Sequence, residues 1–352
     1  MRSLLSILLI AVPVTLILAL VGLTQGMQQD AERRARGTGA DIMVRGTNAA
    51  SAVNFSEASL PEKMVDFLEQ QPHVQMAVGT ITHPIELPLA VSGVDLQKLG
   101  EMSGGMAYLE GGPFQQPNDM IVDRYYATQR DIHAGVTITV MNRSWKVSGV
   151  IEGGKLGHIL VPLRTLQDLL SATGKLSQVF LKLDNPANTS AVIQNLQQKL
   201  GPEYPIWSMD DFVSQLSVNN IQGVKEFTIV VVAIGVVIGF AVVCLSMYMA
   251  VLQRTREIGI LKSLGASKGF ILGIILSEAL LMGIGGTLLG IVMSYGAYWL
   301  IGTLVPASIP MIIVHAWWPI AGAITLVGAS WGALYPGLSA ARQDPIEALA
   351  YE

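Results

Sequence analysis

Four apolar stretches constrain this chain more than any other feature of its sequence. They cover residues 4–23, 227–252, 270–300 and 317–338, the last being less uniformly apolar than the others. Each is long enough to cross a bilayer as a helix, which takes about 20 residues. The first follows Arg2 and is similar to a signal peptide, but its apolar core is longer than usual and no A-x-A cleavage site follows promptly. The sequence therefore predicts four transmembrane helices, with the first retained as an anchor.

The composition is that of a membrane protein with a substantial polar part. Of the 352 residues, 51% are hydrophobic and only 14% are charged, and the mean hydropathy is +0.48. The net charge of −4 argues against nucleic acid as a partner. The single cysteine, Cys244, lies in an apolar stretch and cannot form a disulfide within one chain, so we interpret it as a small buried residue.

The distribution of basic residues predicts the orientation in the membrane. Four of them lie in the loop 253–268, namely Arg254, Arg256, Lys262 and Lys268, whereas the connection 302–316 has none. Because Lys and Arg resist translocation, this loop and both termini are predicted to be cytoplasmic. Three arginines after the first stretch disagree locally: Arg33, Arg34 and Arg36. Long domains translocate largely regardless of their charge. We therefore base the orientation on the loop 253–268 and the connection 302–316.

About 200 residues lie between the first two apolar stretches, and their pattern mixes helix and strand. A helix is predicted over 60–70, with Met64, Phe67 and Leu68 on one face. Residues 136–140 and 145–151 predict a hairpin that turns at Asn142 and Arg143. A strand over 179–183 and an amphipathic helix over 190–200 follow. The predicted fold class is an α-helical membrane protein with four transmembrane helices and a large α+β extracytoplasmic domain between the first and second helices.

Helices are predicted at both ends of this domain, so that it would stand on two helical stalks. Residues 25–36 contain no helix breaker except Gly26 and should continue the first transmembrane helix outward. Ser208 and Asp211 have the spacing of a helix N-cap and its acidic partner. The helix that starts there is expected to run into the second span.

The loop 253–268 is patterned as well as basic. Ile258, Leu261 and Leu264 recur about every three residues, which predicts one apolar face of a short helix. Gly265 is expected to end that helix in the left-handed conformation, and Ser267 to cap the next one. A short amphipathic helix between two spans is suited to contacting a partner at the membrane surface.

Two further features lie inside the apolar stretches. Glu278 is an ionisable residue about two turns into the third stretch, where a carboxylate is costly and suggests a function. The alternative is an interfacial acid that reaches water or pairs with a nearby lysine, and the sequence leaves both open. The pairs Gly235/Gly239 and Gly286/Gly290 have the G-x-x-x-G spacing that permits close helix packing, which is weak evidence for oligomerisation.

The sequence shows no motif for chemistry of its own. The pattern G-x-x-x-x-G-K-[ST] of a nucleotide phosphate loop does not occur, so the chain is not expected to hydrolyse ATP alone. Neither H-E-x-x-H nor C-x-x-C occurs, and the five histidines lack the spacing of metal ligands. We therefore expect no catalytic residue, no metal and no cofactor bound by this chain.

Two motifs together resemble the MacB/FtsX-like family of ABC transporter permeases. R-T-R-E-I-G-I-L-K-S-L-G-A-S, at 254–267, resembles the family's cytoplasmic coupling segment, and P-G-L-S-A-A-R-Q-D-P-I-E-A-L, at 336–349, resembles its C-terminal signature. Segments 109–112, 134–138, 147–151 and 161–163 follow the order of the family's periplasmic core. The resemblance implies three parts: 1–25 as the first transmembrane helix, 26–226 as a MacB-like core with stalks, and 227–352 as an FtsX-like permease domain.

The resemblance also implies partners in a bacterial inner membrane. Two copies of a separate cytoplasmic ATPase would bind ATP and Mg²⁺, a second permease copy or a related permease would complete the dimer, and a periplasmic adaptor is possible. ATP-driven closure would be transmitted through the stalks to the outer domains. The residues expected to contact the ATPase are Arg254, Arg256, Glu257, Ile258, Gly259, Ile260, Leu261, Lys262, Leu264 and Gly265.

Two functions remain as hypotheses. The first is the membrane subunit of an ABC transporter that exports or extracts a substrate on the extracytoplasmic side. The alternative is an FtsX-like signalling subunit that activates an extracytoplasmic cell-wall hydrolase. Family members handle lipoproteins, drugs, peptides or haem, and the sequence does not choose among these substrates.

Overall fold

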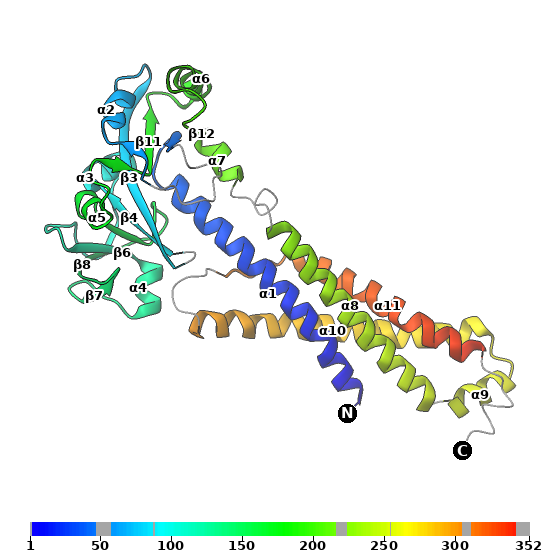
Figure 1. Cartoon of the computed structure of the whole chain (residues 1–352). Helices are drawn as coiled ribbons and strands as arrows, with labels where there is room; N and C mark the ends of the chain where they lie inside the picture. The colour runs from blue at the N-terminus through cyan, green and yellow to red at the C-terminus, as the bar shows by residue number, and fades with distance from the viewer. Residues whose placement is uncertain are drawn as a thin grey trace. The chain divides into compact units, whose positions relative to one another are not determined.

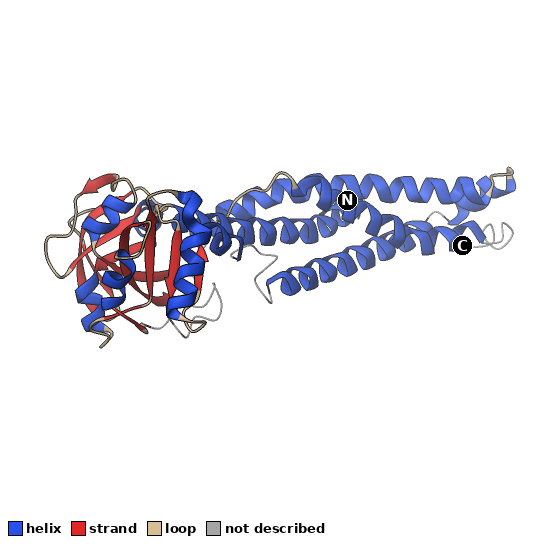
Figure 2. Cartoon of the chain, turned by 90° about the horizontal axis from the view of Figure 1, so that it is seen from above, coloured by secondary structure: helices blue, strands red, loops and turns tan. Residues whose placement is uncertain are grey.

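The computed structural model describes residues 2–46, 58–86, 89–215, 224–253, 255–304 and 311–342. The chain divides into two compact units (Figure 1). One unit, here the helical unit, comprises Met1–Gln25, Gly223–Gly302 and Met311–Glu352, and the other, here the sheet domain, comprises Gly26–Gln222 with Thr303–Pro310. Figure 2 shows that the strands gather in the sheet domain, whereas long helices make up the helical unit.

A ten-stranded mixed sheet forms the centre of the sheet domain, in the order β12-β1-β11-β3-β4-β9-β6-β8-β5, with β7 paired to β8. Among the strand pairs of the described residues, β4–β9 and β6–β8 are parallel and the others antiparallel. The strands are β1 (Ile42–Arg45), β3 (Val74–Glu86), β4 (Leu89–Val94), β5 (Tyr108–Gly111), β6 (Asp119–Asp123), β7 (Thr137–Val140), β8 (Arg143–Ile151), β9 (Ile159–Pro162), β11 (Gln178–Leu183) and β12 (Ile206–Ser208). A separate two-stranded sheet joins β2 (Leu60–Pro61) to β10 (Lys175–Leu176).

Alternating apolar residues give this sheet two buried faces, because successive side chains of a strand point to opposite sides. On β1, Ile42 and Val44 join one hydrophobic cluster while Met43 joins another. Short helices accompany the strands: α2 (Lys63–Glu69), α3 (Leu96–Met102), α4 (Arg124–Arg130), α5 (Leu163–Leu169), α6 (Thr189–Leu200), α7 (Met209–Gln215) and the 3₁₀ helix η1 (Pro186–Asn188). The strand predicted over 179–183 and the helix over 190–200 are confirmed as β11 and α6.

The sheet domain begins and ends on neighbouring strands at one edge of the sheet, β1 and the edge strand β12. Helix α1 (Arg2–Arg36) leads into β1, and β12 leads into α7; Ile42 on β1 pairs with Ser208 on β12. The amide of Met209 donates to the carbonyl of Asp41 at 2.8 Å, and Arg36 Nη1 lies 2.8 Å from Asp210 Oδ1. The two chain segments that connect this domain to the rest of the molecule are therefore tied together at one edge of the sheet.

The two helices predicted at the ends of the domain exist, although one prediction extends beyond the described residues. α1 continues without a break to Arg36, as expected. Ser208 caps α7, since its Oγ accepts from the amide of Asp211 at 3.0 Å and donates to the Asp211 carboxylate at 2.7 Å. The predicted continuation of this helix into the second span involves residues 216–223, which lie outside the described part of the chain.

Two local predictions for the domain need correction. The helix expected from residue 60 begins at Lys63, because Leu60 and Pro61 pair with β10. Phe67 is 38% exposed, while Val65 and Leu68 supply the buried face of α2. Phe67 was therefore wrongly assigned to the apolar face.

The predicted hairpin is confirmed as β7 and β8, but it turns one residue earlier than expected. Val140 pairs with Arg143, so Met141 and Asn142 form the two-residue turn. Both have positive φ, 53° and 56°, as a type I′ turn requires. This turn matches the right-handed twist of the two strands.

The helical unit contains the first 25 residues of the chain together with α8 (Val224–Gln253), α9 (Thr255–Ser263), α10 (Lys268–Leu304) and α11 (Trp317–Arg342). Among the described residues, three helices are long and apolar enough to cross a membrane, within Leu5–Arg36, Val232–Gln253 and Lys268–Leu304. Helix α11 is not one of these three. The fourth span, expected over 317–338, therefore stays a prediction.

Glycines let α10 approach α1 closely. A Cβ at Gly286 would lie 2.5 Å from Ile10 Cγ2, and one at Gly290 would lie 2.7 Å from Val14 Cβ. Thr15 Oγ1 donates to the carbonyl of Gly290 at 3.1 Å across the same contact. The second G-x-x-x-G pair thus packs two helices of one chain together, as close helix packing within membranes commonly does.

Helix α11 presents small residues to both α8 and α10. A Cβ at Gly332 would lie 2.8 Å from the carbonyl oxygen of Phe240 on α8, and one at Gly337 would lie 2.8 Å from Leu272 Cδ1 on α10. The other buried residues of α11 are also small: Ala321, Ala329, Ala333, Pro336, Ala340 and Ala341. A signal for this seam was present in the sequence, because these residues recur at spacings of three and four.

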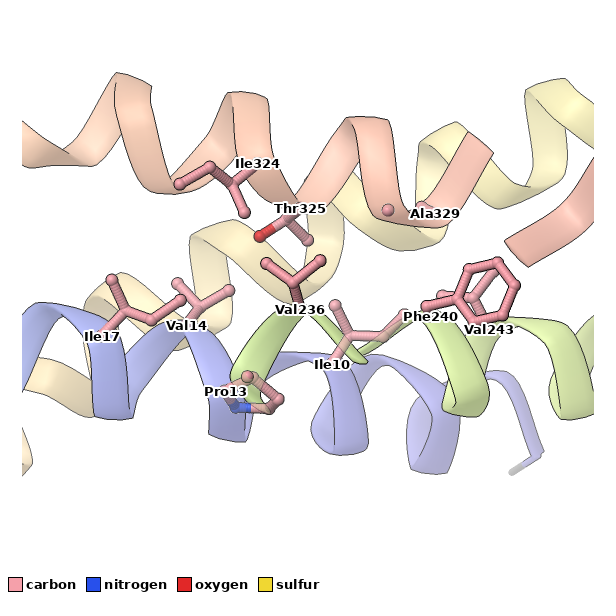
Figure 3. A pocket seen from close by; sticks show the side chains of 12 residues that line it. Ile10, Pro13, Val14, Ile17, Val236, Phe240, Val243, Ile324, Thr325 and Ala329 are labelled. Carbon is pink, nitrogen blue, oxygen red and sulfur yellow. The ribbon is translucent and has the colours of Figure 1, made fainter. Parts of the chain in front are cut away.

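A small apolar cavity lies where α1, α8 and α11 meet. Ile10 and Val14 of α1, Val236 and Phe240 of α8 and Ile324 of α11 are among its lining residues (Figure 3). Its volume is about 20 Å³, which is room for roughly one water molecule. The cavity is thus a packing gap rather than a substrate site.

The glycine contacts generate the first prediction. Gly290→Ala should lower the melting temperature of the detergent-solubilised protein, because overpacking against the branched Val14 costs about 1–3 kcal/mol. Gly296→Ala is the matched control on α10, since a Cβ there meets no atom within 4 Å. That change should be neutral or stabilising by up to about 1 kcal/mol, the gain in helix propensity. Equal melting temperatures for the two variants would show that the α1–α10 contact adapts to a methyl group.

Candidate coupling site

The short helix predicted between the second and third apolar stretches is α9, which lies between α8 and α10 in Figure 1. Thr255 begins it and is 4% exposed. Its Oγ1 donates to the carbonyls of Val251, at 3.1 Å, and Leu252, at 3.0 Å. One hydroxyl thus satisfies carbonyls that the end of α8 leaves without a helical partner, and α9 is fixed to α8 there.

The corner between α9 and α10 has the two caps expected from the sequence. Gly265 has φ +96°, and the amide of Ala266 donates to the carbonyl of Leu261 at 2.9 Å, the bond that defines a Schellman ending. Ser267 Oγ accepts from the amide of Phe270 at 3.2 Å and so caps α10. No atom lies within 4 Å of the position of a Gly265 Cβ, so glycine is needed there for its backbone conformation alone.

The exposed apolar face of α9 contains Leu261 and Leu264 as predicted, but Ile260 takes the place of Ile258. Ile258 is half-buried and packs against the hydrophobic cluster of the helical unit, and Gly259 is buried. Ile260 is 44% exposed, Leu261 37% and Leu264 80%. Since residues advance by about 100° along a helix, these three lie on one side. We call Ile260, Leu261, Leu264 and the exposed Glu257 the α9 surface.

Lys262 holds α9 to α11, a role that the sequence did not suggest. Its Nζ donates to the carbonyl of Ala341 at 3.0 Å, in the last turn of α11, where carbonyls lack helical partners. This lysine therefore contributes to the internal structure of the corner. Arg254 lies outside the described residues, and the side chain of Arg256 on α9 is not described either.

The remaining candidate residues lie along the spans. Glu278 is half-buried on α10, and both interpretations of its role stay open. A Cβ at Gly235 would make ordinary contacts of 3.5 to 3.8 Å with Ile17 and Pro13 of α1. Gly239 lies on α8, but its surroundings are not described. Within the described part of the chain, no three His, Cys, Asp or Glu residues lie close enough together to hold a metal ion.

Two family models together cover most of the chain. Residues 3–199, more than half of it, match the MacB-like periplasmic core domain, and residues 229–345 match the FtsX-like permease C-terminal domain. The chain belongs to the MacB/FtsX-like family of ABC transporter permeases. It is thus the membrane subunit of an ABC transporter.

Relatives that align with the whole chain share about a quarter of its residues. The permease is 25% identical to the ABC transporter permease YknZ of Bacillus subtilis (strain 168), over all of its own length and 96% of that protein. It is 25% identical to the macrolide export ATP-binding/permease protein MacB of Hahella chejuensis (strain KCTC 2396), and covers 58% of that longer protein. These relatives are transporter subunits, so they do not specifically favour the signalling alternative.

Solved structures of outer domains are also similar to parts of the permease. The periplasmic region of MacB from Actinobacillus actinomycetemcomitans aligns with 53% of the permease and 97% of that structure, with TM-score 0.39 and 14% identity. The extracellular domain of the transporter YknZ from Gram-positive bacteria aligns with 48% of the permease and 98% of that structure, with TM-score 0.36 and 14% identity.

The second prediction concerns the corner at Gly265. Gly265→Val should raise amide hydrogen exchange at residues 264–266 by about tenfold, because the left-handed conformation costs a residue with a Cβ about 1–2 kcal/mol. Gly265→Asn is the control, since Asn tolerates this conformation, and it should change exchange much less. Mass spectrometry of the full permease in nanodiscs measures both. If the valine and asparagine variants exchange alike, the corner does not depend on this conformation.

Proposed function

We propose that this permease couples ATP hydrolysis by a separate cytoplasmic ATPase to the export or extraction of a substrate on the extracytoplasmic side of a bacterial inner membrane. The observation that carries the proposal is the α9 surface. It exposes apolar side chains on a helix that is fixed at both ends. An exposed apolar patch rimmed by polar residues is typical of a protein contact. ATP and Mg²⁺ would be bound by the ATPase alone.

The attachments of α9 explain how it would pass on a movement of the ATPase. Thr255 ties it to the end of α8, Lys262 ties it to the end of α11, and the Gly265 corner joins it to α10. A push on the α9 surface is therefore shared by three long helices instead of bending a loose loop. Helix α1 packs against α10 through Gly286 and Gly290 and continues without a break into the sheet domain. This route would transmit the movement mechanically to the outer domain.

We further propose four spans with both termini in the cytoplasm. Aromatic residues gather where α10 ends and α11 begins: Tyr295, Tyr298, Trp299, Trp317 and Trp318. The rings of Tyr295 and Trp318 lie 6.3 Å apart. Aromatic side chains favour the membrane–water interface, and this cluster lies at the opposite end of α10 from the basic loop. The arrangement supports α11 as a return span from the outer to the inner interface.

The working unit is proposed to be a dimer of permeases, either two copies of this chain or this chain with a related one, on a pair of ATPases. Exposed apolar residues on α8 support this, among them Val237 and Leu245, each 65% exposed. Lipid would cover the parts of this face that a second copy leaves free. A periplasmic adaptor is a further possible partner.

The third prediction tests the α9 surface. Leu264→Asp should weaken ATPase binding by at least about tenfold, because a leucine buried in a contact contributes about 1.5–3 kcal/mol. Folding should be unaffected, since Leu264 is 80% exposed. Leu109→Asp, at a 48% exposed position on β5, is the control and should bind normally. Co-purification of the complex and its ATPase rate measure the effect, and normal binding by the Leu264 variant would exclude α9 as the contact.

The fourth prediction tests orientation with single cysteines in a Cys244→Ala background. A cysteine at the exposed Ser171 in the sheet domain should react with an impermeant thiol reagent added to intact spheroplasts. A cysteine at the exposed Ser263 on α9 should react only after lysis. Both positions are accessible in the structure, so only the membrane would distinguish them. The opposite labelling pattern would contradict the proposed topology.

A further inference from the structure

A buried histidine joins α1 to the sheet. His158 is 2% exposed and stands directly before β9. Its Nδ1 lies 2.7 Å from Oδ2 of Asp123, and its Nε2 lies 3.4 Å from Oδ2 of Asp30 on α1. At 3.4 Å the second contact is an ion pair rather than a short hydrogen bond. One imidazole thus spans two carboxylates that belong to different elements.

The surrounding bonds fix both carboxylates in place. Asp123 ends β6 and caps α4, because its Oδ1 accepts from the amide of Tyr126 at 2.8 Å, and its own amide donates to the carbonyl of His158 at 2.9 Å. Asp30 pairs with Arg34 one turn later on α1, at 3.0 Å. The carbonyl of Arg34 in turn accepts from the amide of Leu156 at 3.1 Å. The outer end of α1, the start of α4 and the segment before β9 therefore meet at His158.

We infer that His158 is a proton-dependent clamp between the outer end of α1 and the sheet. As an imidazolium it donates from Nδ1 to Asp123 and forms an ion pair through Nε2 with Asp30, and its charge and that of Arg34 together balance the two carboxylates. As a neutral imidazole it keeps one N–H. One carboxylate then faces a ring nitrogen that cannot donate, and the buried cluster has an unbalanced negative charge, which is costly in a low-dielectric site.

The groups around His158 shift its pKa in opposite directions. From α1 come Asp30 and Arg34, while the exposed Arg33 acts on Asp30; from β6 comes Asp123; and the Tyr125 ring of α4 lies 5.6 Å from the imidazole. Beside the cluster, Glu152 pairs with Arg124 at the surface. Burial lowers the pKa of His158, but its contacts with Asp123 and Asp30 outweigh burial and the nearby Arg34, so its pKa is raised.

The sign of the pH effect follows from this direction. In the unfolded or detached state an ordinary histidine has a pKa of about 6.5. The raised pKa in the clamp means that its stabilisation is fully present below about 6.5 and is lost as the pH rises through the higher folded value. The clamp is therefore closed below about pH 6.5 and loosens as the pH rises through the raised pKa of His158.

Hydrogen exchange of the full permease in nanodiscs tests the clamp. Protection factors, which remove the intrinsic pH dependence of exchange, are measured for the amides of residues 30–36 between about pH 6 and about pH 9. In the wild type, protection should fall by about tenfold across this range. In His158→Gln it should be flat and low. His133→Gln is the control, because His133 also pairs with a carboxylate, Glu110, but is exposed; its profile should match the wild type.

Asp30→Asn provides a second test, because it leaves the pair of His158 and Asp123 intact. It tests the clamp even if His158→Gln fails to fold. At about pH 6 its protection over residues 30–36 should drop to the value that the wild type shows at about pH 9. A flat wild-type profile, a normal profile in His158→Gln, or full protection in Asp30→Asn would each overturn the clamp. The test involves neither ATP nor a substrate, so its result is independent of the proposed coupling function.

Discussion

Inside a bilayer, apolar side chains gain little by leaving lipid for protein, so helices associate through close van der Waals contact and hydrogen bonds. The helical unit meets this condition with small residues where α10 contacts α1 and where α11 contacts α8 and α10. Gly286 and Gly290 admit Ile10 and Val14 of α1 to the backbone of α10, and Gly332 brings α11 against the backbone of α8. The position of α9 depends on these contacts, because Lys262 is anchored on the last turn of α11.

The two units share one continuous element, and it is held at several points. In the helical unit, α1 contacts α10 through glycines and through Thr15. In the sheet domain, its outer end is held by the cluster at His158 and by the pair of Arg36 and Asp210. The proposed mechanical coupling requires a stiff element of this kind between the membrane helices and the sheet domain. A flexible linker would absorb a displacement.

Sequence reasoning succeeded where the determinants are local. The caps at Gly265, Ser267 and Ser208 each depend on a few neighbouring residues, and all three were predicted. It failed where a distant partner decides. Ile258 and Ile260 fit an amphipathic pattern equally well, and only the packing of α9 on the other helices partly buries the first and exposes the second.

The same limit applies to sites built from separate parts of the chain. Leu60 and Pro61 form a strand only because residues more than a hundred positions later pair with them. The cluster at His158 joins Asp30, Asp123 and His158, and no spacing in the sequence connects these three. The sequence also could not identify the helix that packs against Gly286 and Gly290, because a G-x-x-x-G pair is compatible with a partner helix from the same chain or from another copy.

The pairing of β1 with β12 has an evolutionary consequence. Opposed residues of antiparallel strands lie about 5 Å apart at their Cα atoms, so the chain enters and leaves the sheet of this inserted domain at neighbouring positions. Inserted domains with adjacent termini are readily accommodated by the fold that receives them. A different domain that starts and finishes on paired strands could replace this one while the spans remain as they are. Lineages could thus exchange the outer module and retain the membrane machinery.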